Sequence, residues 1–520
     1  MTAAAAATAP HRVGDVFRVR GLELTDHFFD VPLDHANPAS SPTLEIFARE
    51  VVAASKADPS KRADLPYLLY LQGGPGFEAG RPVESGGWIA HATETHRVIL
   101  LDQRGTGRST PVSAALLARV GDAQAQADYL AMHRADAIVA DAEMVRAALG
   151  VDRWAVLGQS FGGFCIARYL GAAPEGLREA FFTGGLPPLV REPDAALPTY
   201  RKLIDRVKAQ NAKYYRRFPG DAARVKAVAR FLLAADDGAG VETPSGGRLS
   251  ARGLQALGFG WLGGAGGMEN LHYLLEKAWD VPGESLSYAF LKGAEVRDAT
   301  FFSVFFRREN RDERRFGSRA RSGSGSEPVR FAVAVPPPIA LRSPRFSVVR
   351  SQDVHSFDTN PIYAMLHESI YCNGGGASAW AAERAIRERF PGEFDVAEAA
   401  ASDDPSRHVL FTGEMVFPFM FDEIAALRPL RPAAEILAAK DDWPRLYDAD
   451  ALNANEVPTA CASYVEDAFV DFDLAAATAA EIRGARVWAT SEYMHSGVRE
   501  DGARILKKLM QMARDEEPER

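Results

Sequence analysis

The sequence contains the run Trp154-Ala155-Val156-Leu157-Gly158-Gln159-Ser160-Phe161-Gly162-Gly163. Its first four residues are apolar, as in a strand buried on both faces of a parallel sheet, and residues 164–170 suit a helix. The middle matches Gly-x-Ser-x-Gly, in which small residues permit the sharp turn that lifts a serine hydroxyl off the edge of a sheet. This context predicts that Ser160 is a catalytic nucleophile.

Further strands and helices continue this pattern in both directions along the chain. Residues 27–31 and 44–52 alternate in polarity, which favours an antiparallel edge leading into a sheet. Short buried strands are predicted at residues 67–71, 98–101, 180–182, 458–465 and 487–490, with helices at residues 135–149 and 505–512. Strands that alternate with helices predict a doubly wound sheet. We therefore expect an α/β fold, with an α/β-hydrolase core built on a mainly parallel sheet.

The alternation of strands and helices stops between residues 186 and 445, where helical segments dominate. We expect this region to be a large inserted helical cap domain, between two parts of the core at residues 21–185 and 446–520. Residues 307–327 are dense in Arg, Glu, Gly and Ser, which predicts a mobile loop. Residues 1–20, with their alanine tract, are predicted to be a disordered tail.

A serine hydroxyl needs a histidine to take its proton and a carboxylate to orient that histidine. In this fold the order along the chain is serine, acid, histidine. His495 follows the last predicted strand and precedes the terminal helix, so we expect it to be the general base. Asp467, at the end of the preceding strand, is the expected acid. Alternatives for the acid are Glu466, Asp471, Asp473 and the more distant Asp194.

The negatively charged intermediate of acyl transfer needs two backbone N–H donors. One is expected from Phe161, the residue after the nucleophile, and the other from the turn after an earlier strand. Gly73-Gly74-Pro75-Gly76 follows the predicted strand at residues 67–71. We expect Gly74 to be the second donor of this oxyanion hole.

Composition and charge exclude several classes of protein. The net charge of -9 is spread along 520 residues without a basic stripe, which argues against nucleic acid as a partner. No apolar run reaches the length of a membrane helix, and the N-terminus lacks the features of a secretory signal. Three well-separated cysteines suit free thiols in a reducing compartment, so we expect a cytoplasmic protein.

The sequence shows no pattern typical of a metal or phosphate site. Residues 102–109 form a glycine-rich segment after a strand, but they lack the spacing of nucleotide-binding loops. A structural turn stabilised by Asp102 and Arg104 is the preferred interpretation. No cluster of His, Cys, Asp and Glu has metal-ligand spacing, so we predict neither a metal nor another cofactor.

Three segments together resemble the prolyl aminopeptidases, also called proline iminopeptidases. They are residues 73–76, residues 102–109 and the elbow at residues 158–163. In that family a histidine usually precedes the first segment, and Gln72 replaces it here. Because the expected oxyanion donor in this turn is a backbone amide, this replacement leaves the expected oxyanion hole unaffected. The spacing of acid and base in the family also favours Asp467. The resemblance implies a serine peptidase that releases an N-terminal residue, typically proline, from small peptides with a free amino terminus.

Recognition of a charged amino terminus requires carboxylates in a dry pocket. The family places glutamates in its cap for this purpose. Glu269 and Glu368 lie in segments that resemble the family's, and Glu414 is a reserve candidate.

Two other functions remain open from the sequence. The same triad would serve an esterase or another hydrolase of carboxylic acid derivatives, because the fold does not fix the substrate. An esterase would not need the cap glutamates. A non-enzymatic binding protein of the same fold would typically have lost a member of the triad, whereas Ser160, Asp467 and His495 are all present.

Overall fold

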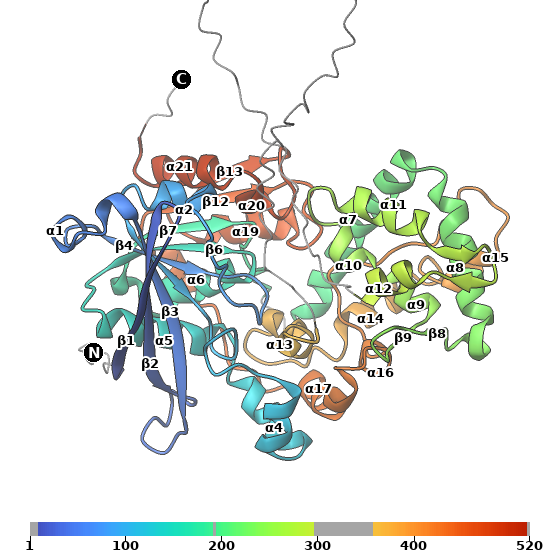
Figure 1. The fold of residues 1–520 in the computed structure, drawn as a ribbon, viewed down its shortest axis with the longest axis horizontal. Coiled ribbons are helices and arrows are strands. Elements are labelled where there is room, and N and C mark those ends of the chain that lie inside the picture. Colours follow the sequence, from blue (N-terminus) through green and yellow to red (C-terminus); the bar gives the residue numbers. More distant parts are fainter. Residues whose placement is uncertain (1–8, 191–193, 296–356, 517–520) are drawn as a thin grey trace, which may run out of the picture. The chain divides into compact units, whose positions relative to one another are not determined.

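A computed structural model describes residues 9–190, 194–295 and 357–516. Its centre is a nine-stranded sheet with the order β1-β2-β3-β5-β4-β6-β7-β12-β13 (Figure 1). In this order, the neighbouring strands from β1 to β5 pair antiparallel. The neighbouring strands from β5 to β13 pair parallel. The strands are β1 (His11–Val19), β2 (Leu22–Pro32), β3 (Thr43–Ala53), β4 (Tyr67–Leu71), β5 (Arg97–Leu101), β6 (Trp154–Gln159), β7 (Leu177–Thr183), β12 (Thr459–Tyr464) and β13 (Arg486–Thr490). This is the mainly parallel α/β-hydrolase sheet that the sequence predicts.

The N-terminal edge of the sheet differs from the prediction. Residues 11–19, assigned to a disordered tail, form strand β1 and pair with β2 over most of its length. The signal is weak because β1 lies at the edge of the sheet, where Val13 and Phe17 remain exposed. With no buried face, the strand shows little of the polarity pattern from which strands are predicted.

The inner parallel strands β4, β5, β6, β7 and β12 are buried on both faces, which explains their continuous apolar sequences, whereas the edge strand β13 is mostly exposed. In β6, Ala155 and Leu157 pack with helices α2 (Gly87–Ala92) and α21 (Gly502–Ala513) on one face. Val156 packs on the other face with α5 (Ala135–Ala148) and α6 (Phe161–Ala172). Figure 1 shows these helix pairs on opposite sides of the sheet. Side chains that alternate between two cores hold β6 and the residues that follow it in place.

Further helices complete the core around these layers. They are α1 (Pro59–Arg62), α3 (Ala114–Val120), α4 (Ala123–Ala131), α18 (Ala449–Asn453), α19 (Phe472–Glu481) and α20 (Gly497–Glu500). Of these, α18 contacts α6, and α19 follows β12.

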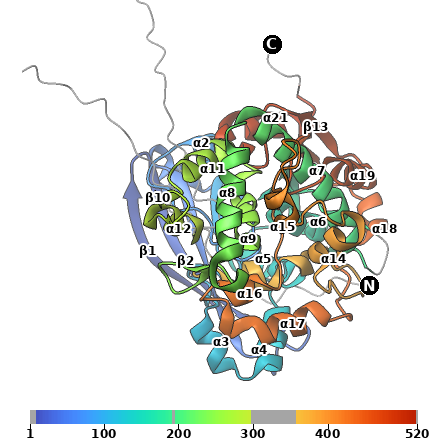
Figure 2. The ribbon, with the colours of Figure 1, turned by 90° about the vertical axis from the view of Figure 1, so that its right-hand side faces the viewer.

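Helical segments fill the described chain between β7 and β12, together with two small hairpins. The helices are α7 (Ala196–Arg217), α8 (Asp221–Ala234), α9 (Ala251–Gln255), α10 (Gly258–Trp261), α11 (Gly267–Glu276), α12 (Tyr288–Glu295), α13 (Pro361–Leu366), α14 (Ala381–Arg389), α15 (Val396–Ala401), α16 (Met420–Glu423) and α17 (Arg431–Ala439). The hairpins pair β8 (Val241–Glu242) with β9 (Arg248–Leu249), and β10 (Trp279–Val281) with β11 (Ser285–Leu286). Figure 2 shows α8 beside α11 and α15, with which it packs. We call these segments the cap.

The cap shares a hydrophobic cluster with the core. Side chains of α7 and α8 belong to the same buried cluster as those of α5 and α6. The predicted loop at residues 307–327 lies outside the described residues. Over the described part of the chain, no helix has both the length and the apolar character needed to span a membrane.

The glycine-rich segment after β5 is a structural turn, as its sequence indicates. Asp102 is fully buried, accepts hydrogen bonds from the backbone N–H groups of Ala79 at 3.1 Å and Arg108 at 2.9 Å, and pairs with Arg81. Arg104 is also buried and pairs with Asp141 at 2.6 Å. Both charges are neutralised within the fold, which suits a structural role.

Candidate active site

Ser160 lies in a sharp turn between β6 and α6. Its φ of 53° and ψ of -124° are strained for a residue with a side chain. The neighbouring glycines make this turn possible: a Cβ atom at Gly162 would lie 1.9 Å from the carbonyl oxygen of Leu71, and one at Gly163 would lie 2.3 Å from that of Gly185. The elbow therefore packs directly against neighbouring backbone, and only glycine fits at positions 162 and 163.

His495 and Asp467 meet in loops that follow neighbouring strands of the sheet. The Nδ1 atom of His495 lies 2.8 Å from Oδ2 of Asp467. The other oxygen of Asp467 accepts hydrogen bonds from the backbone N–H groups of Phe469 at 2.7 Å and Val470 at 3.0 Å. The carboxylate is thus fixed by its own loop, and it fixes the imidazole in turn.

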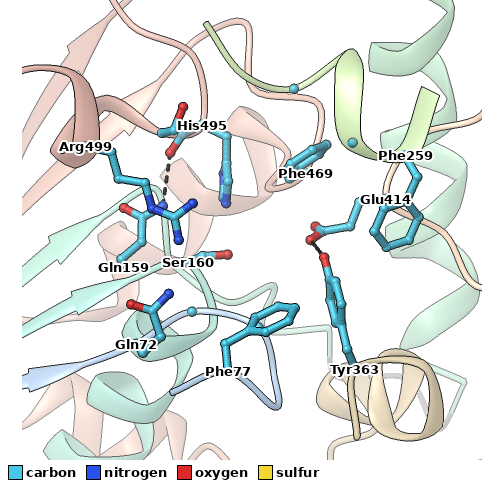
Figure 3. A pocket seen from close by; sticks show the side chains of 15 residues that line it. Gln72, Phe77, Gln159, Ser160, Phe259, Tyr363, Glu414, Phe469, His495 and Arg499 are labelled. Carbon is cyan, nitrogen blue, oxygen red and sulfur yellow. Dashed lines mark hydrogen bonds between the residues drawn. The ribbon is translucent and has the colours of Figure 1, made fainter. Parts of the chain in front are cut away.

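The backbone of His495 is held from two sides. Its carbonyl oxygen accepts a hydrogen bond from Nε2 of Gln159 at 3.1 Å, and its N–H donates to the carbonyl oxygen of Gly263 in the cap at 3.1 Å. Figure 3 shows the free end of the imidazole ring pointing toward Ser160. Burial disfavours the charged imidazole, but the negative charge and hydrogen bond of Asp467 outweigh it, so the pKa of His495 lies above its usual value.

The alternative acids are engaged elsewhere. Asp471 caps the N-terminus of α19 and pairs with Arg206 at 2.8 Å, and Asp473 pairs with the same arginine at 3.0 Å. Glu466 pairs with a lysine of α7, and Asp194 pairs with an arginine of α14 at 2.9 Å. Among the five carboxylates considered from the sequence, Asp467 is the one bonded to His495.

The glycine-rich turn after β4 packs directly on the elbow. A Cβ atom at Gly73 would lie 3.0 Å from the backbone oxygen of Gln159 and 3.0 Å from Cβ of Ser160. Gly74 has a φ of 137°, which favours glycine, and it lines the same pocket as Ser160. Phe161 is the first residue of α6, so its N–H has no acceptor within the helix. Two backbone segments with N–H donors therefore flank the serine.

A pocket opens over these groups. The core supplies Ser160 and His495 at its base. Aromatic side chains form much of its walls, and these are Phe77, Phe259, Tyr363 and Phe469. Figure 3 shows them on the side of Ser160 where the cap lies. The pocket is thus lined by apolar rings next to a serine, a histidine and a partly buried acid.

Glu414 is the predicted glutamate that lies in this pocket. It belongs to the cap, where it lies between α15 and α16. Its carboxylate accepts a hydrogen bond from the hydroxyl of Tyr363 (Figure 3). Burial raises the pKa of Glu414 to about 7, although the charge of His495 and the bond from Tyr363 both oppose this shift. The carboxylate is therefore poised between its neutral and charged forms near neutral pH.

The other two predicted glutamates lie away from the pocket, which corrects the expectation from the sequence. Glu368 is buried, but its two oxygens accept hydrogen bonds from the N–H groups of Ala381 and Ala382 at 3.0 Å each, at the start of α14. Glu269 lies on the surface of α11 and pairs with Arg217. One carboxylate holds a helix end and the other a surface ion pair, so neither is aimed at Ser160.

Several pocket residues were not predicted from the sequence. The four aromatic residues of the walls come from four separate segments of the chain. In the sequence they cannot be distinguished from ordinary core residues, because those are apolar too. Arg499 also lines the pocket, four residues after the histidine. Its position in α20 (Gly497–Glu500), shortly after the base, was the signal that could have identified it.

Known proteins are similar to this chain over most of its length. A family model described as the alpha/beta hydrolase fold matches residues 66–237. The chain is 41% identical to a proline iminopeptidase of Aeromonas sobria, over 95% of this chain and 97% of that protein. It is 31% identical to a proline iminopeptidase of Aspergillus aculeatus, over 94% of this chain and 93% of that protein. A solved proline iminopeptidase of Mycobacterium smegmatis aligns with 94% of this chain and 98% of its own, at 15% identity and a TM-score of 0.38.

Proposed function

Because the chain belongs to the proline iminopeptidase family and is a hydrolase of the α/β-hydrolase fold, we propose that it releases an N-terminal residue, preferably proline, from small peptides. The observation that carries this proposal is the pocket that combines Ser160 and His495 with a partly buried carboxylate, Glu414. The first two groups suit acyl transfer, and the third suits a substrate with a positive charge next to its scissile bond.

In the proposed reaction, Ser160 Oγ attacks the carbonyl carbon of the first residue while Nε2 of His495 takes the hydroxyl proton. Asp467, hydrogen-bonded to Nδ1, holds the ring and stabilises its positive charge. The backbone N–H groups of Phe161 and Gly74 stabilise the oxyanion. His495 then gives the proton to the leaving amine, the C–N bond breaks, and an acyl-enzyme ester remains. Water, deprotonated by His495, releases the amino acid and restores the serine.

Substrate recognition in this proposal rests on Glu414. A substrate ammonium beside its carboxylate would form a charge-assisted hydrogen bond in a site with little water. The hydroxyl of Tyr363 holds the carboxylate from the other side. The aromatic walls suit the compact apolar ring of proline. A blocked amine would leave Glu414 buried without a positive partner, which is costly.

This reasoning also weighs against the esterase alternative. A buried carboxylate costs free energy unless it finds a partner. An esterase acting on neutral acyl groups would bear that cost although its substrates offer the carboxylate no positive partner.

We also propose that the protein is cytoplasmic. The three cysteines, Cys165, Cys372 and Cys461, are buried and form no disulfide, which suits a reducing compartment.

The test is a panel of chromogenic anilides that carry proline, alanine or N-acetylproline. We expect turnover of the free prolyl anilide, slower turnover of the alanyl anilide, and none of the N-acetylated one. Ser160→Ala serves as the control for adventitious peptidase. Equal cleavage of blocked and free prolyl anilides would refute the proposed specificity.

A further inference from the structure

The pocket carries two opposite charges on opposite sides of the nucleophile. Figure 3 shows the carboxylate of Glu414 on one side of Ser160 and the guanidinium of Arg499 on the other. We propose that Arg499 binds the α-carboxylate of the residue that follows the scissile bond, so that dipeptides are the preferred substrates. This inference rests on the proposed function and assigns the side of the site that receives the leaving group.

The direction of the substrate follows from the two groups that must contact it. If Glu414 holds the amino terminus, the first residue lies on the cap side of Ser160. His495 must reach the leaving nitrogen to protonate it, so the second residue lies beside the imidazole. Arg499 belongs to the same segment, since it lies in α20, directly after the histidine loop, with its N–H bonded to the carbonyl oxygen of Ser496 at 2.8 Å. The arginine therefore occupies the side on which the second residue leaves.

Peptide geometry gives this position a length preference. In a dipeptide, the carboxylate carbon is two bonds beyond the leaving nitrogen, which is about 2.5 Å away. Each further residue moves the terminal carboxylate by about 3.8 Å and puts a neutral amide in its place. A cation next to His495 thus meets a carboxylate only when the substrate ends at its second residue.

The chemistry of the neighbouring side chains supports an anion on this side. Two carboxamides line the pocket near Arg499, but Gln159 donates to the carbonyl oxygen of His495, and Gln72 accepts a hydrogen bond from Tyr70 at 2.9 Å. The planar guanidinium matches the two oxygens of a carboxylate, and such pairs are stronger than neutral hydrogen bonds. The positive charge of Arg499 is thus the feature of this side that selects between ligands.

The experiment measures kcat/KM at pH 8 for Pro-Gly and for its neutral amide, Pro-Gly-NH2, by release of proline. We expect the wild-type enzyme to prefer the acid by about ten-fold or more, as for a charge-assisted bond. In Arg499→Gln the ratio of acid to amide should fall to about one. The matched control is Arg504→Gln, which removes the same charge from an exposed arginine that pairs with Glu492. This control should keep the wild-type ratio.

Three results would overturn the proposal. One is a wild-type enzyme with no preference for the acid. Another is an Arg499→Gln variant that loses activity on acid and amide equally, since the arginine would then act through His495 or the fold. The third is cleavage of Pro-Glu-NH2 as fast as Pro-Gly, because the carboxylate would then come from a side chain. A prolyl anilide has no carboxylate, so its hydrolysis tests the proposed function alone. If the wild type cleaves the anilide, any of these three results overturns only the role of Arg499; if it does not, the proposed function itself fails.

Discussion

Replacing Glu414 with Gln should stabilise the protein at pH 8 and weaken its activity. Burial raises the pKa of this carboxyl from 4.5 to about 7. One pKa unit corresponds to about 1.4 kcal/mol, so ionised Glu414 costs about 3 kcal/mol of folding free energy. Because the pKa is higher in the folded state, the contribution of this group to stability is complete below pH 4.5 and is lost as the pH rises to about 7. Gln carries no charge, yet its oxygen can still accept the hydrogen bond from Tyr363.

Unfolding of the wild type and Glu414→Gln should therefore be compared at pH 8 and pH 5. At pH 8 the variant should gain about 3 kcal/mol, and at pH 5 the gain should shrink to below about 1 kcal/mol. Glu269→Gln is the matched control, because that carboxylate is partly exposed and paired with Arg217 and should give no such pH-dependent gain. An equal gain at both pH values, or none at pH 8, would show that ionisation of Glu414 does not destabilise the folded protein.

Activity supplies the second half of this prediction. Loss of the charge-assisted bond should lower kcat/KM for a free prolyl anilide by about 10- to 150-fold, equivalent to about 1.5 to 3 kcal/mol. Hydrolysis of a small acetyl ester should change little, since it makes no contact through an ammonium. In the wild type, kcat/KM for the anilide should also fall as the pH drops below about 7, where Glu414 becomes neutral. Unchanged turnover of the anilide by Glu414→Gln would refute its role in recognition.

Three further outcomes are expected. Ser160→Ala should keep its far-UV circular dichroism spectrum and lose about three orders of magnitude or more in turnover, and a fully active variant would contradict its role as nucleophile. Asp467→Asn should be severely impaired in anilide turnover, whereas Asp471→Asn should not, and the reverse would mean that the acid is assigned wrongly. Gly162→Ala should lower thermal stability by about 3 kcal/mol or more, because the new Cβ would collide with the Leu71 carbonyl, and a wild-type melting curve would speak against this packing.

The sheet and its elbow could be predicted because their signals are local. A strand buried on both faces is apolar throughout, and a strand-to-helix turn around Ser160 must contain glycine, so both features are visible in a short window. The order of serine, acid and histidine along the chain then restricted the base and acid to loops after late strands. The structure brings His495 and Asp467 together at 2.8 Å.

The pocket wall could not be predicted in the same way. Whether a cap glutamate faces Ser160 depends on how helices far apart in sequence pack, and neighbouring residues say little about that. Glu368 and Glu269 have family-like surroundings, but one holds the end of α14 and the other pairs with Arg217. Strand β1 was missed for a related reason, since an edge strand with an exposed face resembles a polar tail.

The hydrogen bond between the N–H of His495 and the carbonyl oxygen of Gly263 has a consequence for protein engineering. It anchors the base of the proposed triad to the backbone of the cap. A Cβ atom at position 263 would lie 2.3 Å from the ring of Phe469, so this anchor accepts no larger residue without repacking. The cap is therefore no interchangeable module: a chimaera that grafts another cap onto this core must rebuild that carbonyl, or its histidine will lose one of the two bonds that hold its backbone.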